Sequence, residues 1–305
     1  MMVADSSLSP DWLIPLVAAQ DALARLEAAV MMSTASVRDG LLVRLAYREA
    51  AGWLAHYGNW VHPVDLAFRD AGLTGSYAAA DLGTRLPSVL PATMRGIGVA
   101  TPPEDRDVAA ALRHARLWRR LAELRSWSPD GLPDSAGIDG SPALLAAARV
   151  VCGGARQEGL TATAVRAAAW IWRERGGTGW PGLVFWSAPV QQLHRLTMMP
   201  QAGLLAGVLD AVAEAALLAR RELSWLRAAE IQASGIAMTA RSRLPAVVAV
   251  ALRRPALTAR MLANELGISH RAALDAIYRL VEAGVLREAT GRAAWRGFVI
   301  AAGTR

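Results

Sequence analysis

Apolar residues recur every three or four positions through most of the chain, a spacing that is typical of amphipathic helices burying one face. Leu16, Leu23 and Leu26 form the first such stripe. Glycine and proline interrupt the pattern between stripes, and we expect the helices to end there. The pattern predicts helices over residues 12–30, 41–57, 60–71, 105–127, 143–151, 161–175, 183–199 and 202–233.

Two segments interrupt the helical pattern most strongly. Residues 128–142 are rich in Pro, Gly, Asp and Ser, which is typical of a linker or an exposed loop. Residues 176–182 hold four glycines and one proline and predict a turn, because a phosphate-binding loop would need a preceding strand and a lysine. We therefore expect an N-terminal helical region, a linker or loop, a middle helical region and a C-terminal module. Their ranges are 1–127, 128–142, 143–236 and 237–305.

The C-terminal module has the pattern of a helix-turn-helix. We expect a first helix over residues 244–253 and a second helix that Thr258 caps. Gly267 supplies the unusual backbone conformation of the turn, and Ser269 caps a third helix over residues 270–283.

Two short strands are expected after this third helix. Gly284 ends the helix, residues 285–287 form one strand, residues 290–292 make a tight turn, and residues 295–301 form the return strand. A hairpin in this place is typical of a winged helix. The whole pattern predicts a mainly α protein with multi-helix N-terminal and middle regions and a C-terminal winged helix-turn-helix.

The positive charge of the chain is concentrated in the C-terminal module. Residues 237–305 hold eleven Arg and four acidic residues, whereas residues 1–236 hold 22 Arg and 22 acidic residues. The module therefore accounts for the whole net charge of +7. Because duplex DNA carries a dense line of phosphate charge, a compact basic module is typical of a nucleic-acid-binding domain.

The third helix of the module has an apolar face, with Ala273, Ile277 and Leu280, that would pack on the second helix. The remaining side chains would meet the major groove or its flanking phosphates. Asp275 is also on that outer face, where it either accepts a hydrogen bond from cytosine or keeps the helix out of the groove. The residues expected to contact DNA are Ser269, His270, Arg271, Asp275, Tyr278, Arg279, Arg292 and Arg296.

Composition narrows the chemistry open to the chain. There is no lysine, which excludes a Schiff-base or phosphate-loop lysine. Cys152 is the single cysteine and is predicted to be a core residue, so an intrachain disulfide and a multi-cysteine zinc site are excluded. His62 and Asp65 are predicted to start the helix at Pro63 rather than to bind a metal with His56. We expect no catalytic residue, no metal and no cofactor, and therefore no enzyme.

No signal peptide is visible in residues 1–10. The longest apolar stretch, residues 202–219, is interrupted by Asp210 and Glu214, which indicates a buried helix rather than a membrane span. We expect a cytoplasmic protein that does not enter the membrane.

Several tryptophans gather in the middle region. Clusters of this kind line effector pockets or stack on bases, but in a neutral helical region core packing or a dimer interface is favoured. The clustered residues are Trp170, Trp172, Trp180 and Trp186.

Several segments at both ends of the chain match a known family pattern. These are Ala22–Leu26, Tyr47–Ala51, Val61–Leu66, Asp70–Gly72, Leu257–Gly291 and Trp295–Gly297. Through them the chain resembles an uncharacterised family common in rhizobia and related alphaproteobacteria, in which a helical domain of unknown function precedes a C-terminal helix-turn-helix DNA-binding domain. The chain departs from the family pattern at Pro63 and in its Trp-rich middle. The resemblance implies DNA binding and no known activity.

The sequence thus predicts a protein that binds double-stranded DNA, as a transcriptional regulator or a plasmid-linked factor. Residues 1–236 would form a homodimer or bind a small-molecule effector. The alternative is an enzyme of unknown type, or a protein-interaction module, whose winged helix serves as a docking domain, since a fold does not determine a function.

Overall fold

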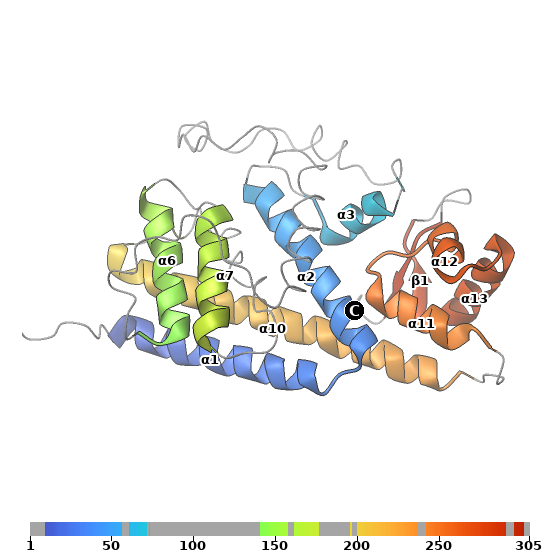
Figure 1. Ribbon diagram of the computed structural model, residues 1–305, viewed down its shortest axis with the longest axis horizontal. Helices are drawn as coiled ribbons and strands as arrows, with labels where there is room; N and C mark the ends of the chain where they lie inside the picture. The colour runs from blue at the N-terminus through green and yellow to red at the C-terminus, as the bar shows by residue number, and fades with distance from the viewer. Residues whose placement is uncertain are drawn as a thin grey trace, which may run out of the picture.

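This computed structural model describes residues 10–56, 61–71, 73, 141–157, 162–176, 196, 200–236, 242–290 and 296–301. The described chain is mainly helical, as predicted (Figure 1). Its helices before the C-terminal module are α1 (Pro10–Met31), α2 (Ala35–His56), α3 (Pro63–Asp70), α6 (Ala143–Gln157), α7 (Ala162–Gly176) and α10 (Gln201–Ser234). The predicted helix over residues 105–127, and nearly all of the one over 183–199, lie outside the described residues.

The longest described helix, α10, is the axis on which the other helices pack. Its 34 residues span about 50 Å at the usual rise per residue. α1 lies beside α10 and runs in the same direction, and the Thr34 hydroxyl that follows α1 donates to the Glu230 carboxylate at 2.6 Å (Figure 1). α6 and α7 pair with each other near one end of α10, and α2 crosses it farther along. Apolar residues of all these helices share one continuous core.

Two helix starts follow from local hydrogen bonds. α2 begins at Ala35, earlier than the predicted residue 41, because Thr34 accepts from the backbone N–H of Val37 at 3.4 Å and Val37 itself is buried. α3 begins at Pro63 as predicted, and the His62 side chain caps it by accepting from the Val64 N–H at 3.2 Å. The predicted helix-start role of His62 is therefore confirmed.

The C-terminal module consists of α11 (Leu244–Arg253), α12 (Ala259–Leu266), α13 (His270–Glu282), β1 (Leu286–Glu288) and β2 (Phe298–Ile300). The two strands form an antiparallel hairpin in which Leu286 pairs with Ile300 and Glu288 pairs with Phe298. Leu257, just before α12, adds a bridge to Phe298 with N–H to O distances of 2.9 and 2.8 Å. The predicted hairpin after the third helix is confirmed, with strands at residues 286–288 and 298–300 in place of the predicted 285–287 and 295–301. Residues 291–295, which include most of the predicted tight turn, lie outside the described residues.

The predicted caps and turn of the module are also confirmed. Thr258 Oγ1 accepts from the Met261 N–H at 3.1 Å, and Ser269 Oγ accepts from the Ala272 N–H at 3.2 Å. Gly267 ends α12 in the left-handed conformation with φ 60°, which residues with a side chain rarely adopt. The starts of α12 and α13 and the end of α12 therefore follow from local hydrogen bonds and backbone conformation.

Outside the module, Cys152 is buried, as predicted. Trp170 and Trp172 of α7 are half-buried against the core, whereas Trp180 and Trp186 lie outside the described residues. Among the described helices, none combines the length and apolarity that crossing a membrane requires.

Candidate nucleic-acid interface

α13 has one buried face and one face in solvent. Ala273, Ile277 and Leu280 are fully buried against the rest of the module, as predicted from their spacing. Arg271 and Asp275 lie on the opposite side of the helix and are exposed. Because packing of the buried face fixes the position of α13, its outer side chains project from a rigid backbone.

Arg271 and Asp275 form an ion pair one helical turn apart, with 3.2 Å between Nε and Oδ1. The Arg271 side chain is 86% exposed and that of Asp275 is 58% exposed. Ion pairs this exposed contribute little to stability, so the pair can open for a ligand at small cost. Both residues were predicted to lie on the outer face of α13, and both do.

Tyr278 and Arg296 contact each other across the module. The Tyr278 hydroxyl accepts a hydrogen bond from Arg296 Nη1, and the Tyr278 ring packs edge-on against Phe298 with centroids 6.2 Å apart. Arg296 also lies 3.9 Å from a Glu288 carboxylate oxygen. These contacts tie α13 to the hairpin, and the contact of both residues with DNA stays a prediction.

The remaining predicted contact residues lie around the start and outer side of α13. Ser269 uses its hydroxyl to cap the helix, and His270 follows it in solvent. Arg279 is exposed one turn beyond Asp275. Arg292 lies outside the described residues.

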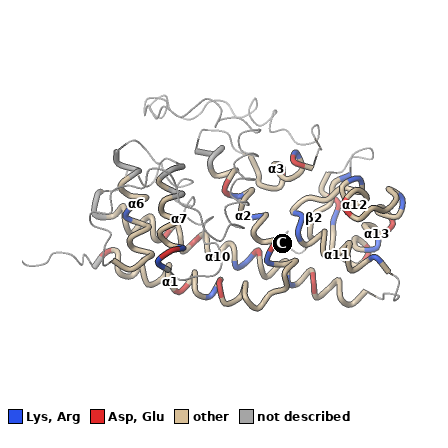
Figure 2. The backbone as a smooth tube through the Cα atoms, in the orientation of Figure 1, with Lys and Arg blue, Asp and Glu red and all other residues tan. Residues whose placement is uncertain are grey.

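The charge of the outer face of α13 is more balanced than the composition of the module suggests. Asp275 and Glu282 are exposed on the same side as Arg271 and Arg279. Additional positive charge comes from Arg260, which is exposed in the first turn of α12 and was not among the residues predicted from the sequence. Figure 2 shows Arg positions on α12 as well as on α13. Arg260 could have been recognised from its position just after the Thr258 cap, since α12 is the first helix of the helix-turn-helix motif and this helix crosses the DNA backbone in such complexes.

Two other arginines of the module form ion pairs within the module. Arg254 Nη2 lies 3.0 Å from a Glu265 carboxylate oxygen, and Arg253 Nη2 lies 3.5 Å from the other. They join the end of α11 to α12. Their charge is therefore partly neutralised before any ligand arrives.

The module is fixed to the helical part by side chains that reach its backbone. Arg44 of α2 donates to the carbonyl oxygens of Leu252 and Arg254, at 2.7 and 3.1 Å, where α11 ends. Gln232 of α10 donates to the Ala283 carbonyl oxygen at the end of α13, at 2.6 Å. These bonds satisfy carbonyls that a helix end leaves without partners, so they link the orientation of α11 and α13 to the helical part.

Close backbone approach strengthens this docking. A Cβ atom on Gly40 of α2 would lie 2.2 Å from the Leu252 carbonyl oxygen, and one on Gly297 would lie 2.3 Å from the Phe68 ring. Only glycine fits at these two contacts. None of these partners could be identified from spacing in the sequence.

Comparison with protein families identifies the module. A family model described as an HTH DNA-binding domain matches residues 244–300, from the start of α11 to the end of β2. Residues 244–300 form a helix-turn-helix DNA-binding domain. No curated protein matches the chain. Among the described residues, no group of three His, Cys, Asp or Glu side chains could hold a metal ion.

Proposed function

We propose that this protein is a regulator of transcription that reads double-stranded DNA with α13 and uses the β1–β2 hairpin as a wing. The observation that carries the proposal is the exposed position of Arg271. The Arg271 side chain is 86% exposed in the first turn of a capped helix, within a helix-turn-helix DNA-binding domain. The start of this helix is the part that reaches base edges in such complexes.

The geometry supports a division of roles among the outer residues. Arg271 would grip guanine through two hydrogen bonds, and Asp275, one turn on, would accept from cytosine or restrain Arg271. Arg279 and Arg260 flank this pair and would contact phosphates. The helix N-terminus itself, with its Ser269 cap, favours a phosphate beside it.

A homodimer fits this function, because two half-sites on DNA multiply affinity. The helical part exposes large apolar side chains on the two neighbouring helices α1 and α10. Met31 and Met32 lie at the end of α1, and Ile231 lies near the end of α10, where the Thr34–Glu230 hydrogen bond joins the two helices. Exposed apolar groups on adjacent helices support a protein contact there. Light scattering on the full chain should then give twice the monomer mass, and Ile231→Arg should lower it.

The experiment that tests DNA reading combines selection with a matched pair of variants. Genomic fragments are first selected on the purified protein, and the enriched site is bound to the parent, Arg271→Ala and Arg25→Ala. Arg25 forms an exposed ion pair with Asp21 on α1, also one turn apart, so it is a control of the same kind outside the DNA-binding domain.

Arg271→Ala should weaken the binding free energy for the selected site by about 1–3 kcal/mol, and Arg25→Ala should leave that binding free energy unchanged. If Arg271→Ala binds the selected site as tightly as the parent, α13 does not read bases. The module would then serve as a protein-docking domain, which is the second candidate function.

A further inference from the structure

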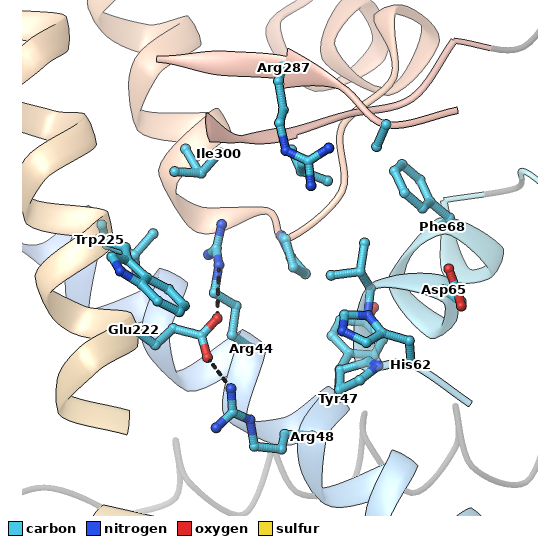
Figure 3. A pocket seen from close by; sticks show the side chains of 16 residues that line it. Arg44, Tyr47, Arg48, His62, Asp65, Phe68, Glu222, Trp225, Arg287 and Ile300 are labelled. Atoms are coloured by element: carbon cyan, nitrogen blue, oxygen red, sulfur yellow. Dashed lines mark hydrogen bonds and ion pairs between the residues drawn. The ribbon is translucent and has the colours of Figure 1, made fainter. Parts of the chain in front are cut away.

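A pocket of about 580 Å³ lies where the DNA-binding domain meets the helical part. Helices α2, α3 and α10 form one side of it, and the β1–β2 hairpin with Pro255 forms the other (Figure 3). This volume is in the range that holds a small organic molecule. The interface between two parts of a protein is also a common location for such sites.

The polar side of the pocket carries more positive than negative charge. Arg44 and Arg48 share one carboxylate, that of Glu222, at 3.8 and 2.8 Å. Burial lowers the pKa of Arg44 to about 10, against the opposing effect of Glu222, so Arg44 stays protonated at neutral pH. One carboxylate therefore faces two guanidinium groups.

Arg287 adds a third positive charge from the opposite wall. It lies on β1, and Figure 3 shows its side chain extending from the strand into the pocket. No carboxylate in the described part of the chain forms an ion pair with it. The other acidic residue of the lining, Asp65, is partly buried, and this burial raises the pKa of its carboxyl group against the effects of His62 and Arg69. An exposed positive group that lines a pocket and has no ion-pair partner among the described residues favours an anionic ligand.

The rest of the lining is apolar and comes from both parts of the protein. Trp225 of α10 and Phe68 of α3 offer flat aromatic surfaces, and Val64 lies with them on the helical side. Val299 and Ile300 of β2 line the opposite side. A ligand that fits this lining combines a negative group with an apolar, planar body.

We propose that this pocket binds a small organic carboxylate with a planar apolar body, and that Arg287 donates to the carboxylate. As an extension that rests on the proposed DNA-binding function, the bound carboxylate changes the affinity of the protein for DNA. Trp225 and Phe68 would hold the apolar body, and Arg44 and Arg48 would add to the positive potential of the pocket.

The coupling follows from which residues the ligand would join. Arg287 belongs to the hairpin that follows α13 directly, between Leu286 and Glu288, and Glu288 lies beside Arg296 and hence beside Tyr278 of α13. Arg48 belongs to α2, which also carries Arg44 with its bonds to the end of α11. A ligand that joins Arg287 of the hairpin to Trp225 and Phe68 of the helical part therefore favours one orientation of the DNA-binding domain on the helical part. A ligand acts only through such differences between states.

The first experiment measures ligand binding without DNA. The melting temperature of the full chain is recorded with phenylacetate, indole-3-acetate and hexanoate, each at millimolar concentrations, and with phenylacetamide as the uncharged match to phenylacetate. The variants are Arg287→Gln and a control, Arg227→Gln, which replaces an exposed arginine of α10 outside the pocket. Both substitutions are at exposed positions, so both variants should fold with the melting temperature of the parent.

We expect at least one aromatic carboxylate to raise the melting temperature of the parent and of Arg227→Gln, and to do so much less for Arg287→Gln, because binding to the folded state stabilises it by mass action. Phenylacetamide should give no rise. The ligand assignment is overturned if neither aromatic carboxylate raises the melting temperature more than hexanoate does, or if Arg287→Gln responds as the parent does.

The second experiment measures DNA affinity for the selected site with and without the carboxylate that binds best. A change of about fivefold or more, absent in Arg287→Gln, supports the coupling. A change under twofold overturns the coupling and leaves the ligand assignment in place. If the protein selects no DNA at all, the proposed function fails, and the melting temperatures still decide whether the pocket binds carboxylates.

Discussion

The guanidinium group of Arg44 donates to the carbonyl oxygen of Leu252 at 2.7 Å, so a buried charge of α2 satisfies the end of the first helix of the DNA-binding domain. The same group donates to the Gly40 carbonyl oxygen of its own helix at 3.0 Å, and it faces Glu222 of α10. Arg44 therefore joins three elements that are far apart along the chain. These contacts fix the orientation of the DNA-binding domain on the helical part, so the two are joined by more than a covalent linker.

Arg44→Ala should lower the free energy of unfolding by about 2–4 kcal/mol, because it leaves buried carbonyl oxygens without donors and Glu222 with Arg48 alone. Urea denaturation of the full chain measures the loss. Arg227→Ala, at an exposed position of α10, is the control and should change the value by less than about 0.5 kcal/mol. A similar small change for Arg44→Ala would mean that water replaces its hydrogen bonds without cost.

The local structure of the DNA-binding domain was predictable because its signals are short-range. Thr258, Gly267 and Ser269 each determine a cap or a turn through hydrogen bonds within three residues of themselves or through their own backbone conformation. These effects do not depend on the rest of the fold. The alternation of apolar positions in α13 then placed Arg271 and Asp275 on the outer face.

The docking of that domain was not predictable from the same sequence. Arg44 and Gln232 act on carbonyl oxygens of the backbone, which every residue has, so no pattern of residue types marks their partners. The pocket is hidden for a related reason, because Arg48, Arg287 and Trp225 come from three elements that only the tertiary packing brings together. The net charge of the domain likewise does not show that Arg253 and Arg254 are paired with Glu265.

Two glycines provide a matched test of the contact between α2 and α11. Gly40→Ala should destabilise the protein by about 1–3 kcal/mol, because the new Cβ would lie 2.2 Å from the Leu252 carbonyl oxygen and the helices would have to separate. Gly153→Ala, in α6, meets nothing within 4 Å and should stabilise by up to about 1 kcal/mol through helix propensity. Thermal denaturation compares the two. Equal effects would show that α2 and α11 are not in close contact in solution.

Asp65 should make stability fall as the pH rises through a mildly acidic window. Burial raises the pKa of its carboxyl group above the ordinary value of 3.8, with His62 and Arg69 opposing the shift, so the folded state binds a proton that the unfolded state has already lost. Asp65→Asn has no titrating group at this position. Its free energy of unfolding, relative to that of the parent, should therefore increase as the pH rises from 3 through the raised pKa of Asp65. Urea denaturation of both proteins across this range measures the difference. A difference that is constant with pH would contradict the raised pKa.

Asp275→Ala tests whether this carboxylate restrains Arg271 or reads a base. If it restrains Arg271 and repels phosphate, the variant should bind all DNA more tightly and discriminate less between sequences. The slope of log affinity against log salt should become steeper by up to about 0.9, the value expected for one additional phosphate contact. Fluorescence anisotropy on the selected site and on a scrambled duplex, over a range of salt concentrations, measures both effects.

Asp21→Ala is the matched control for Asp275→Ala, because Asp21 pairs with Arg25 on the exposed face of α1 in the same way. It should leave affinity and salt slope as in the parent. A loss of affinity by Asp275→Ala that is confined to the selected site would instead assign the carboxylate to base recognition, since an acceptor for cytosine helps only where cytosine is present. Unchanged binding to both duplexes would place Asp275, and with it the outer face of α13, away from the DNA.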